Sequence, residues 1–151
     1  MLREYIRAIL TESFGALYYH GRDGSTNFNE GKPAFFTKER GAAEWYAESR
    51  GDRSPTVHTA QLTFSNPASS ADLTKAVKLS GATGKDVATH SPNGPDDFFN
   101  DYLYVPSVQQ TLEEMGFDAF EGWDILTNEE VEIVVVWHPR QIHIVKSERV
   151  G

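Results

Sequence analysis

The sequence predicts an α+β domain with a split, mostly antiparallel β-sheet and short helices. The order of patterns predicts this class: a helical segment comes first, strands mixed with short helices follow, and the end of the chain is rich in strands. The final strand patterns lie at Val131–Trp137 and, after a proline, at Gln141–Lys146. At 151 residues with 39% hydrophobic composition, the chain has the size and core material of one domain.

The first elements follow from periodicity. Apolar residues recur at helical spacing over residues 2–12, which predicts an amphipathic helix that either packs on the domain or docks a partner. We therefore separate an N-terminal helical segment, residues 1–14, from the domain at residues 15–151. Ala16–His20 predicts a strand that stops at its histidine, and Gly21–Lys32 is too rich in Gly, Asn and Asp for regular structure.

The central elements alternate between strand and helix. Ala34–Thr37 predicts a short strand, and the following "KERGAAEWYAES" predicts a helix whose small-residue face packs closely. Thr56–Phe64 alternates in polarity, which predicts a half-buried strand. Its expected apolar face carries Ala60, Leu62 and Phe64, and its expected polar face carries Thr59, Gln61 and Thr63.

Capping and turn residues predict the bounds of the elements in the second half of the chain. Ser69 or Ser70 is the expected N-cap of a helix that ends at Gly81, and residues 82–96 predict a mobile surface segment because they are rich in Gly, Pro and Ser. The remaining predicted elements are a short helix beginning at Pro95, a helix over Val108–Met115 ended by Gly116, a strand over Ala119–Trp123, a turn near Thr127–Asn128, and the two final strands.

Charge and composition narrow the function classes. Asp and Glu number 22 against 14 Lys and Arg, a net charge of −8, so the broad basic surface typical of nucleic-acid binding is not expected. The chain has no cysteine, which excludes disulfides, thiolate metal ligands and a cysteine nucleophile. No apolar run has the length of a membrane helix, and the N-terminus lacks the features of a signal peptide, so we expect a cytoplasmic protein.

His20 is the first candidate for chemistry. It ends a predicted strand, and Gly21 behind it would let a ligand approach the backbone. A neutral imidazole donates from one nitrogen and accepts at the other, so it can hold a ribose hydroxyl. The alternative is an exposed turn histidine. The five histidines show no helical pair of ligand spacing, and we expect no metal; P-loop, G-x-G-x-x-G and G-x-S-x-G motifs are also absent from the sequence.

The second candidate is a carboxylate near the C-terminus. Glu129, Glu130 and Glu132 precede the most apolar strand of the chain, and Glu121 lies on the strand before it. A carboxylate held at the edge of a buried strand can orient a hydroxyl or stabilise a developing cation. Glu129 and Glu130 are expected in a solvated turn, and Glu121 also has the alternative of pointing to water.

The ordered motifs resemble the ADP-ribosyltransferase superfamily. "LYYHG", "AFFT" followed by "GAAEWYA", "VHTAQLTFSNP", "GFDAF" and "EIVVVWHPRQI" succeed one another over residues 16–146. The similarity is greatest to the small domains of phage and mobile-element polyvalent proteins. The resemblance implies a split sheet around a cleft that binds NAD, with NAD as substrate and no metal.

The resemblance also implies residue roles. His20 matches the histidine that hydrogen-bonds an NAD ribose, and Gly21 matches the backbone contact to the nicotinamide amide. Phe35 and Phe36 occupy the position where many members carry a tyrosine that stacks on nicotinamide, so a stacking face remains without the hydroxyl. Glu132 matches the catalytic acid that holds the ribose 2′-hydroxyl, with Glu121 as the alternative. The further residues expected to contact NAD are Tyr19, Thr37 and Tyr46.

The implied activity is mono-ADP-ribosylation of a macromolecular acceptor, with protein as the expected class, by a phage-encoded enzyme acting in a bacterial cell. The alternatives are a catalytically degenerate binding module that kept the fold, and an NAD glycohydrolase toxin that uses water as acceptor. In the binding-module alternative, the N-terminal helix ties the protein to a phage particle or larger assembly.

Overall fold

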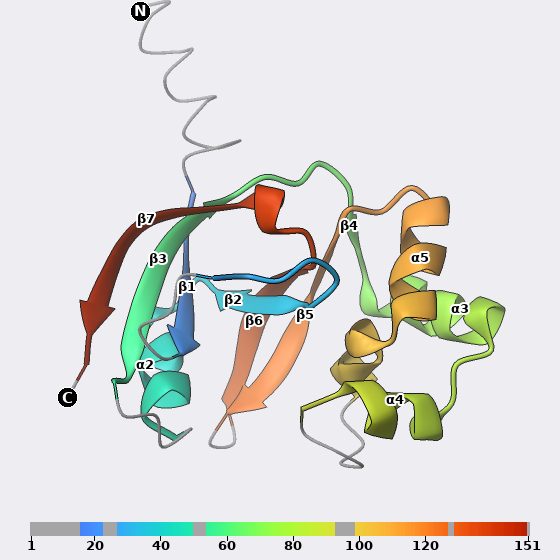
Figure 1. Ribbon diagram of the computed structural model, residues 1–151, viewed down its shortest axis with the longest axis horizontal. Coiled ribbons are helices and arrows are strands. Elements are labelled where there is room, and N and C mark those ends of the chain that lie inside the picture. The colour runs from blue at the N-terminus through green and yellow to red at the C-terminus, as the bar shows by residue number, and fades with distance from the viewer. Residues whose placement is uncertain (1–15, 23–26, 50–53, 93–98, 127–128, 151) are drawn as a thin grey trace, which may run out of the picture. The chain divides into compact units, whose positions relative to one another are not determined.

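The computed structural model describes residues 16–22, 27–49, 54–92, 99–126 and 129–150 (Figure 1). Within these ranges the chain forms seven β-strands and short α- and 3₁₀-helices, so the α+β class is confirmed. The helix predicted over residues 2–12 and the turn predicted at Thr127–Asn128 lie outside the described residues.

The chain divides into two compact units. The first contains the described residues up to Asn27, those of Phe36–Thr63 and those from Arg140 onward; the second contains Phe28–Phe35 and the described residues of Phe64–Pro139. The short strand β2 (Ala34–Thr37) begins in the second unit and ends in the first.

The strands of the first unit pair side by side. β1 (Leu17–Arg22) is antiparallel to the end of β2 and to β3 (Thr56–Leu62), and β3 is antiparallel to β7 (Ile142–Arg149). The expectation that the first strand stops at its histidine is wrong. β1 continues to Arg22 because its ladder with β3 continues through Gly21–Val57 and Arg22–Thr56.

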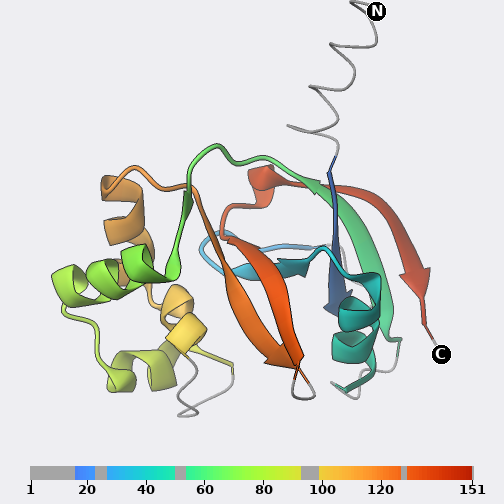
Figure 2. The ribbon, with the colours of Figure 1, turned by 180° about the vertical axis from the view of Figure 1, so that it is seen from behind.

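One helix covers a face of these strands. α2 (Arg40–Ser49) lies against β1 and β3, and its buried residues are Ala43 and Ala47 (Figure 2). The small-residue face predicted for this helix is therefore the packed face. Arg40 joins the helix to β7 through an ion pair with Glu148, Nη1 to Oε1 at 2.9 Å.

The second unit holds the remaining strands. β5 (Ala119–Leu126) pairs antiparallel with β6 (Glu129–Val136) and parallel with the two-residue β4 (Pro67–Ala68). In the described residues, β4 and β5 pair in parallel, whereas the β1–β2, β1–β3, β3–β7 and β5–β6 pairs are antiparallel. Glu129 and Glu130 are exposed but belong to β6, where they pair with Leu126 and Ile125, so placing them in the turn was wrong.

Helices lie to one side of β5 and β6 in the second unit (Figures 1 and 2). The first is α3 (Ser70–Ser80), which has Ser69 as its N-cap and Gly81 in the left-handed conformation at its C-terminus, as predicted. A capping box, in which Ser69 and Asp72 satisfy each other's backbone groups, begins this helix. The helices that follow it are α4 (Gly84–His90), the 3₁₀-helix η1 (Phe99–Tyr104) and α5 (Pro106–Glu114).

α4 contradicts the irregular segment predicted for residues 82–96. Thr83 and Asp86 form a second capping box that begins the helix, and Val87 is buried in the core. The local start signal and one apolar anchor therefore outweigh the Gly-rich composition. Residues 93–98, which include Pro95, lie outside the described residues.

The core of the second unit is contiguous. It packs the helices against the inner face of β5 and β6, and Phe35, Tyr102, Met115 and Phe117 border it. Its buried members are Ala68, Leu73, Ala76, Val87, Leu103, Val105, Val108, Leu112, Phe120, Ile133, Val135 and Trp137. Of the described helices, none is long and apolar enough to cross a membrane.

Candidate functional site

His20 lies beside an aromatic ring on the next strand. The centroids of His20 and Phe36 are 5.2 Å apart and their planes are tilted by 41°. β1 is in register with β3 from Leu17 to Arg22, whereas its register with β2 consists of Tyr19–Thr37. His20 follows Tyr19 on β1, and Phe36 precedes Thr37 on β2, so the two rings lie next to the Tyr19–Thr37 pair.

Gly21 has a packing role that the sequence did not indicate. A Cβ at this position would lie 1.9 Å from the carbonyl oxygen of Ala43 and 2.8 Å from the amide nitrogen of Ala47. The Cα of Gly21 therefore faces α2. Since side chains alternate along a strand, His20 points to the sheet face opposite α2. The expected contact of the Gly21 backbone with a ligand stays a prediction.

Three other predicted NAD contacts lie on the α2 side. Tyr19 shares the face of Gly21 by alternation, and Thr37 is its register partner on β2. The Thr37 hydroxyl accepts a hydrogen bond from the Glu39 backbone N–H at 3.0 Å, in the turn that leads into α2. Tyr46 lies on α2 itself, with its ring edge-on to Trp45. The structure therefore groups His20 with Phe36 and places these three residues on the other side of the sheet.

Phe35 and Phe36, adjacent in sequence, have different surroundings. Phe36 is buried, with 1% of its surface exposed. Phe35 belongs to the second unit, where its ring stacks on Tyr104 with centroids 5.7 Å apart and planes 29° apart. Of the two, Phe36 is therefore the ring beside the candidate histidine.

The two candidate acids share one face of the β5–β6 ladder. Glu132 is the register partner of Trp123, and Glu121 is the register partner of Val134. Glu121 and Glu132 are therefore diagonal neighbours on the face opposite the core, and Trp123 is next to both of them on that face. Both acids are half-buried, and Trp123 is 58% exposed. Gly122 between Glu121 and Trp123 faces inward, where a Cβ would meet the ring of Phe120.

The predicted site residues therefore fall into two groups, one in each unit. His20 and Phe36 belong to the first unit, and Glu121 and Glu132 belong to the second. The expectation that an imidazole, a phenyl ring and a carboxylate share one NAD-binding cleft stays a prediction.

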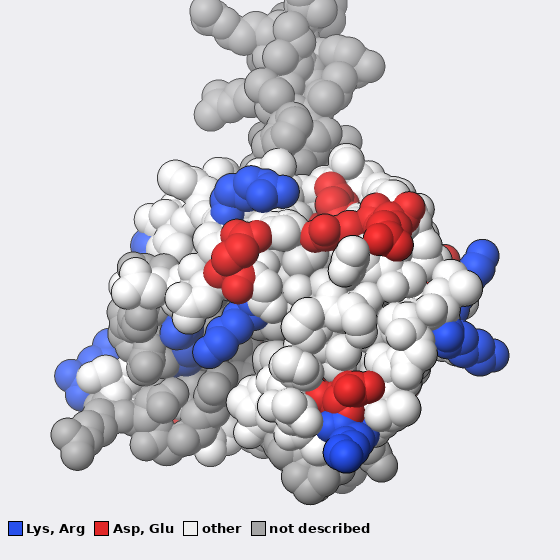
Figure 3. All heavy atoms as spheres, turned by 45° about the vertical axis from the view of Figure 1, so that its right-hand side comes forward, with Lys and Arg blue, Asp and Glu red and all other residues white. Residues whose placement is uncertain are grey.

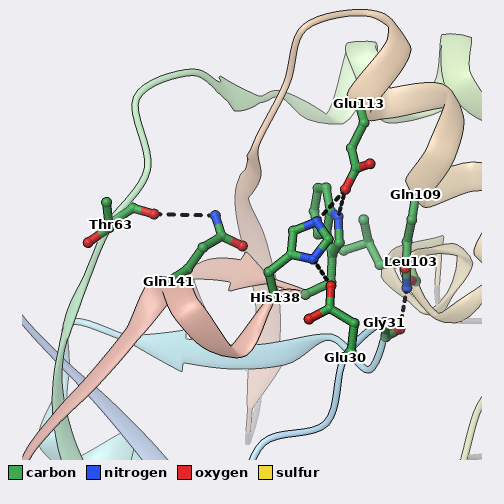
Figure 4. Close-up of polar contacts among 9 residues, drawn as sticks. Glu30, Gly31, Thr63, Leu103, Gln109, Glu113, His138 and Gln141 are labelled. Carbon is green, nitrogen blue, oxygen red and sulfur yellow. Dashed lines mark hydrogen bonds and ion pairs between the residues drawn. The ribbon is translucent and has the colours of Figure 1, made fainter.

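The "HPRQI" segment contains two separate polar arrangements, both drawn in Figure 4. In the first unit, Gln141 and Thr63 are joined twice: the Thr63 N–H donates to the Gln141 carbonyl at 2.9 Å, and the Gln141 side-chain amide donates to the Thr63 carbonyl at 3.2 Å. This buried glutamine holds the start of β7 against the end of β3. Its position in the motif has a structural reason.

In the second unit, His138 lies between two carboxylates (Figure 4). Its Nδ1 contacts Glu30 and its Nε2 contacts Glu113, which also accepts a 2.8 Å hydrogen bond from the Trp137 indole. Each ring nitrogen of His138 therefore contacts its own carboxylate. The described residues contain no group of three or more His, Cys, Asp or Glu placed to hold a metal ion.

Sequence reasoning overlooked one part of the first unit. His58 is fully buried on β3, directly opposite His20, and its Nδ1 lies 2.6 Å from the Ser147 hydroxyl on β7. The signal was present in the alternation of residues 56–64: continued backwards, the face of Ala60 and Leu62 includes His58.

Comparisons of the chain with protein-family models, with curated proteins and with solved structures found no match.

Proposed function

We propose that this protein is a mono-ADP-ribosyltransferase that uses NAD to modify a protein acceptor, on an ADP-ribosyltransferase-like fold. The observation that carries the proposal is the contact of the His20 ring with the Phe36 ring on the neighbouring strand. An imidazole held beside an aromatic ring can present a nitrogen to a ribose hydroxyl. The order of the motifs from "LYYHG" to "HPRQI" supports the same assignment.

The proposed chemistry needs few groups. The bond between nicotinamide and ribose breaks with its electron pair leaving on nicotinamide, positive charge develops on the sugar, and the acceptor nucleophile forms the new bond. His20 would hold a ribose hydroxyl. Glu132 would hold the 2′-hydroxyl and stabilise the charge, because a carboxylate preorganised beside a developing cation lowers the barrier. The half-buried environment of Glu132 on a paired strand supports this role.

The decisive experiment measures nicotinamide release from NAD, with and without acceptor, for Glu132→Gln. We expect Glu132→Gln to lose about 3 kcal/mol of transition-state stabilisation, which corresponds to a rate about a hundred-fold lower. Glu130→Gln is the matched control, because Glu130 lies two residues away on the same face of β6 and is exposed. Full activity in Glu132→Gln would refute Glu132 as the acid, and loss of activity in Glu121→Gln would assign that role to Glu121.

A catalytically degenerate binding module is the second candidate, and the identity and surroundings of Phe35 and Phe36 favour it. Neither Phe35 nor Phe36 carries the tyrosine hydroxyl, Phe36 is buried, and Phe35 stacks on Tyr104. Calorimetry separates the candidates, because the transferase must bind NAD and the degenerate module need not. Binding at micromolar to millimolar NAD supports the transferase, and no heat at millimolar NAD supports the module.

The acceptor and the setting are part of the proposal. We place the protein in the cytoplasm of a bacterial cell, encoded by a phage. Charged side chains lie in small groups of both signs among uncharged residues on the face drawn in Figure 3, and the net charge is −8, which favours a protein over a nucleic-acid acceptor. A lysate labelled with a tagged NAD analogue would show a labelled protein band with the wild type and none with Glu132→Gln. Free ADP-ribose without a labelled acceptor would instead identify an NAD glycohydrolase.

A further inference from the structure

A row of four side chains crosses the first unit. Phe36 on β2 contacts the ring of His20 on β1, His20 is the register partner of His58 on β3, and His58 is the register partner of Ser147 on β7. Residues paired in this way project from the same face of an antiparallel sheet, with Cβ atoms about 5 Å apart. The row therefore joins the candidate histidine to two polar residues that the proposed chemistry does not use.

His58 is the buried member of the row. It is 0% exposed, and its Nδ1 lies 2.6 Å from the Ser147 hydroxyl. Because a buried polar group is costly to leave without a hydrogen bond, this contact favours one orientation of the ring. The bond at Nδ1 holds one edge of the ring toward β7. Nε2 is on the side of the ring away from Ser147. The strand on that side of β3 is β1, which carries His20.

We propose that His58, held by Ser147, is a positioning residue that sets the ring orientation and tautomer of His20. The His20 nitrogen that faces a ribose hydroxyl donates to it when protonated and accepts from it when not, so the tautomer sets the direction of this hydrogen bond. Phe36 contacts the ring of His20 from β2, and His58 is the register partner of His20 on β3. The effect of His58 on NAD binding rests on the proposed function, whereas its effect on the His20 ring does not.

The experiment records ¹⁵N signals of the histidine rings in the full-length protein, with the His20 signals assigned from His20→Gln. Two variants test the row: His58→Phe keeps a ring of similar size without polar atoms, and Ser147→Ala removes only the hydroxyl. Ser147 is exposed, so its variant is expected to fold even where the core substitution does not. In both variants we expect the His20 nitrogen signals to move toward those of a free imidazole that exchanges between tautomers.

Thr59→Val is the matched control. Thr59 is the next residue on β3, is buried and points to the opposite face, and its hydroxyl has no hydrogen-bond partner among the described residues. We expect this variant to leave the His20 signals unchanged. Unchanged His20 signals in Ser147→Ala and in folded His58→Phe would overturn the proposal.

NAD binding, measured on the same samples, separates this proposal from the proposed function. With both correct, His58→Phe shifts the His20 signals and weakens NAD binding by about ten-fold, the loss of one oriented hydrogen bond. Shifted signals in a protein that never binds NAD would support the positioning role of His58 and count against the transferase. Wild-type NAD binding with unshifted signals would overturn the positioning role alone.

Discussion

Gly21 on β1 lies so close to Ala43 on α2 that a Cβ at Gly21 would be 1.9 Å from the Ala43 carbonyl oxygen. The strand and the helix meet backbone to backbone at this point, and the buried alanines of α2 provide the matching surface. The contact also directs His20, since the neighbour of a residue that faces the helix must face away from it. One glycine thus couples helix packing to the orientation of the candidate histidine.

Gly21→Ala is expected to lower the free energy of unfolding by about 3 kcal/mol. The new Cβ would collide with backbone atoms of α2, which cannot move aside as the end of a flexible side chain can. Chemical denaturation followed by circular dichroism measures the change. Gly41→Ala is the control: Gly41 is exposed on the same helix, a Cβ there meets nothing within 4 Å, and alanine should stabilise by up to about 1 kcal/mol. Equal stability of the two variants would contradict the close packing.

Glu113→Ala is expected to cost about 2 kcal/mol, because it removes the acceptor of the Trp137 indole, a side chain only 1% exposed. Urea unfolding monitored by tryptophan fluorescence measures the loss. Glu114→Ala changes the neighbouring exposed residue and should stay within about 0.5 kcal/mol of the wild type. A loss of similar size in both variants would show that the indole bond is not the cause.

Ser69→Ala is expected to destabilise the protein by about 1 kcal/mol, because the serine hydroxyl accepts from the Asp72 N–H at the start of α3. Thermal unfolding measures this change. Ser70→Ala substitutes the next, exposed serine inside the helix and should have little effect, within about 0.5 kcal/mol. The N-cap assignment would be wrong if Ser70→Ala were the more damaging change.

Glu148 is expected to make stability depend on pH. Hydrogen bonds from Lys146 and then from Arg40 lower the pKa of Glu148 below its ordinary value of 4.5. Because the folded-state pKa is the lower one, the stabilisation is present above pH 4.5 and is lost as the pH falls through the folded-state pKa. Glu148→Gln should therefore melt slightly below the wild type at pH 7, and the two melting temperatures should converge in acid.

High salt at pH 7 should reduce the same difference, because Glu148 and its partners are partly exposed and screened. A difference between wild type and Glu148→Gln that persists at the lowest pH at which the protein stays folded would show that the charge is not responsible.

Elements with local start and stop signals could be predicted from sequence. Ser69 and Gly81 bound α3 because a hydroxyl acceptor and a left-handed glycine act within a few residues of themselves. α4 was missed because its only strong signals, the Thr83–Asp86 capping box and buried Val87, lie in a Gly-rich segment. The extension of β1 to Arg22 was missed because it depends on pairing with Thr56 and Val57, which lie on a strand distant in the sequence.

The sequence by itself determined the α+β class, most strands and helices, and the candidates His20, Phe36 and Glu132, because periodicity, capping and residue chemistry are local properties. Only the tertiary structure decided that Gly21 is needed by α2, that His20 faces away from that helix, and that His58 and Ser147 stand in line with it. These relationships arise from strand register and helix docking. Both are set by the free energy of packing between distant segments, which no single segment encodes.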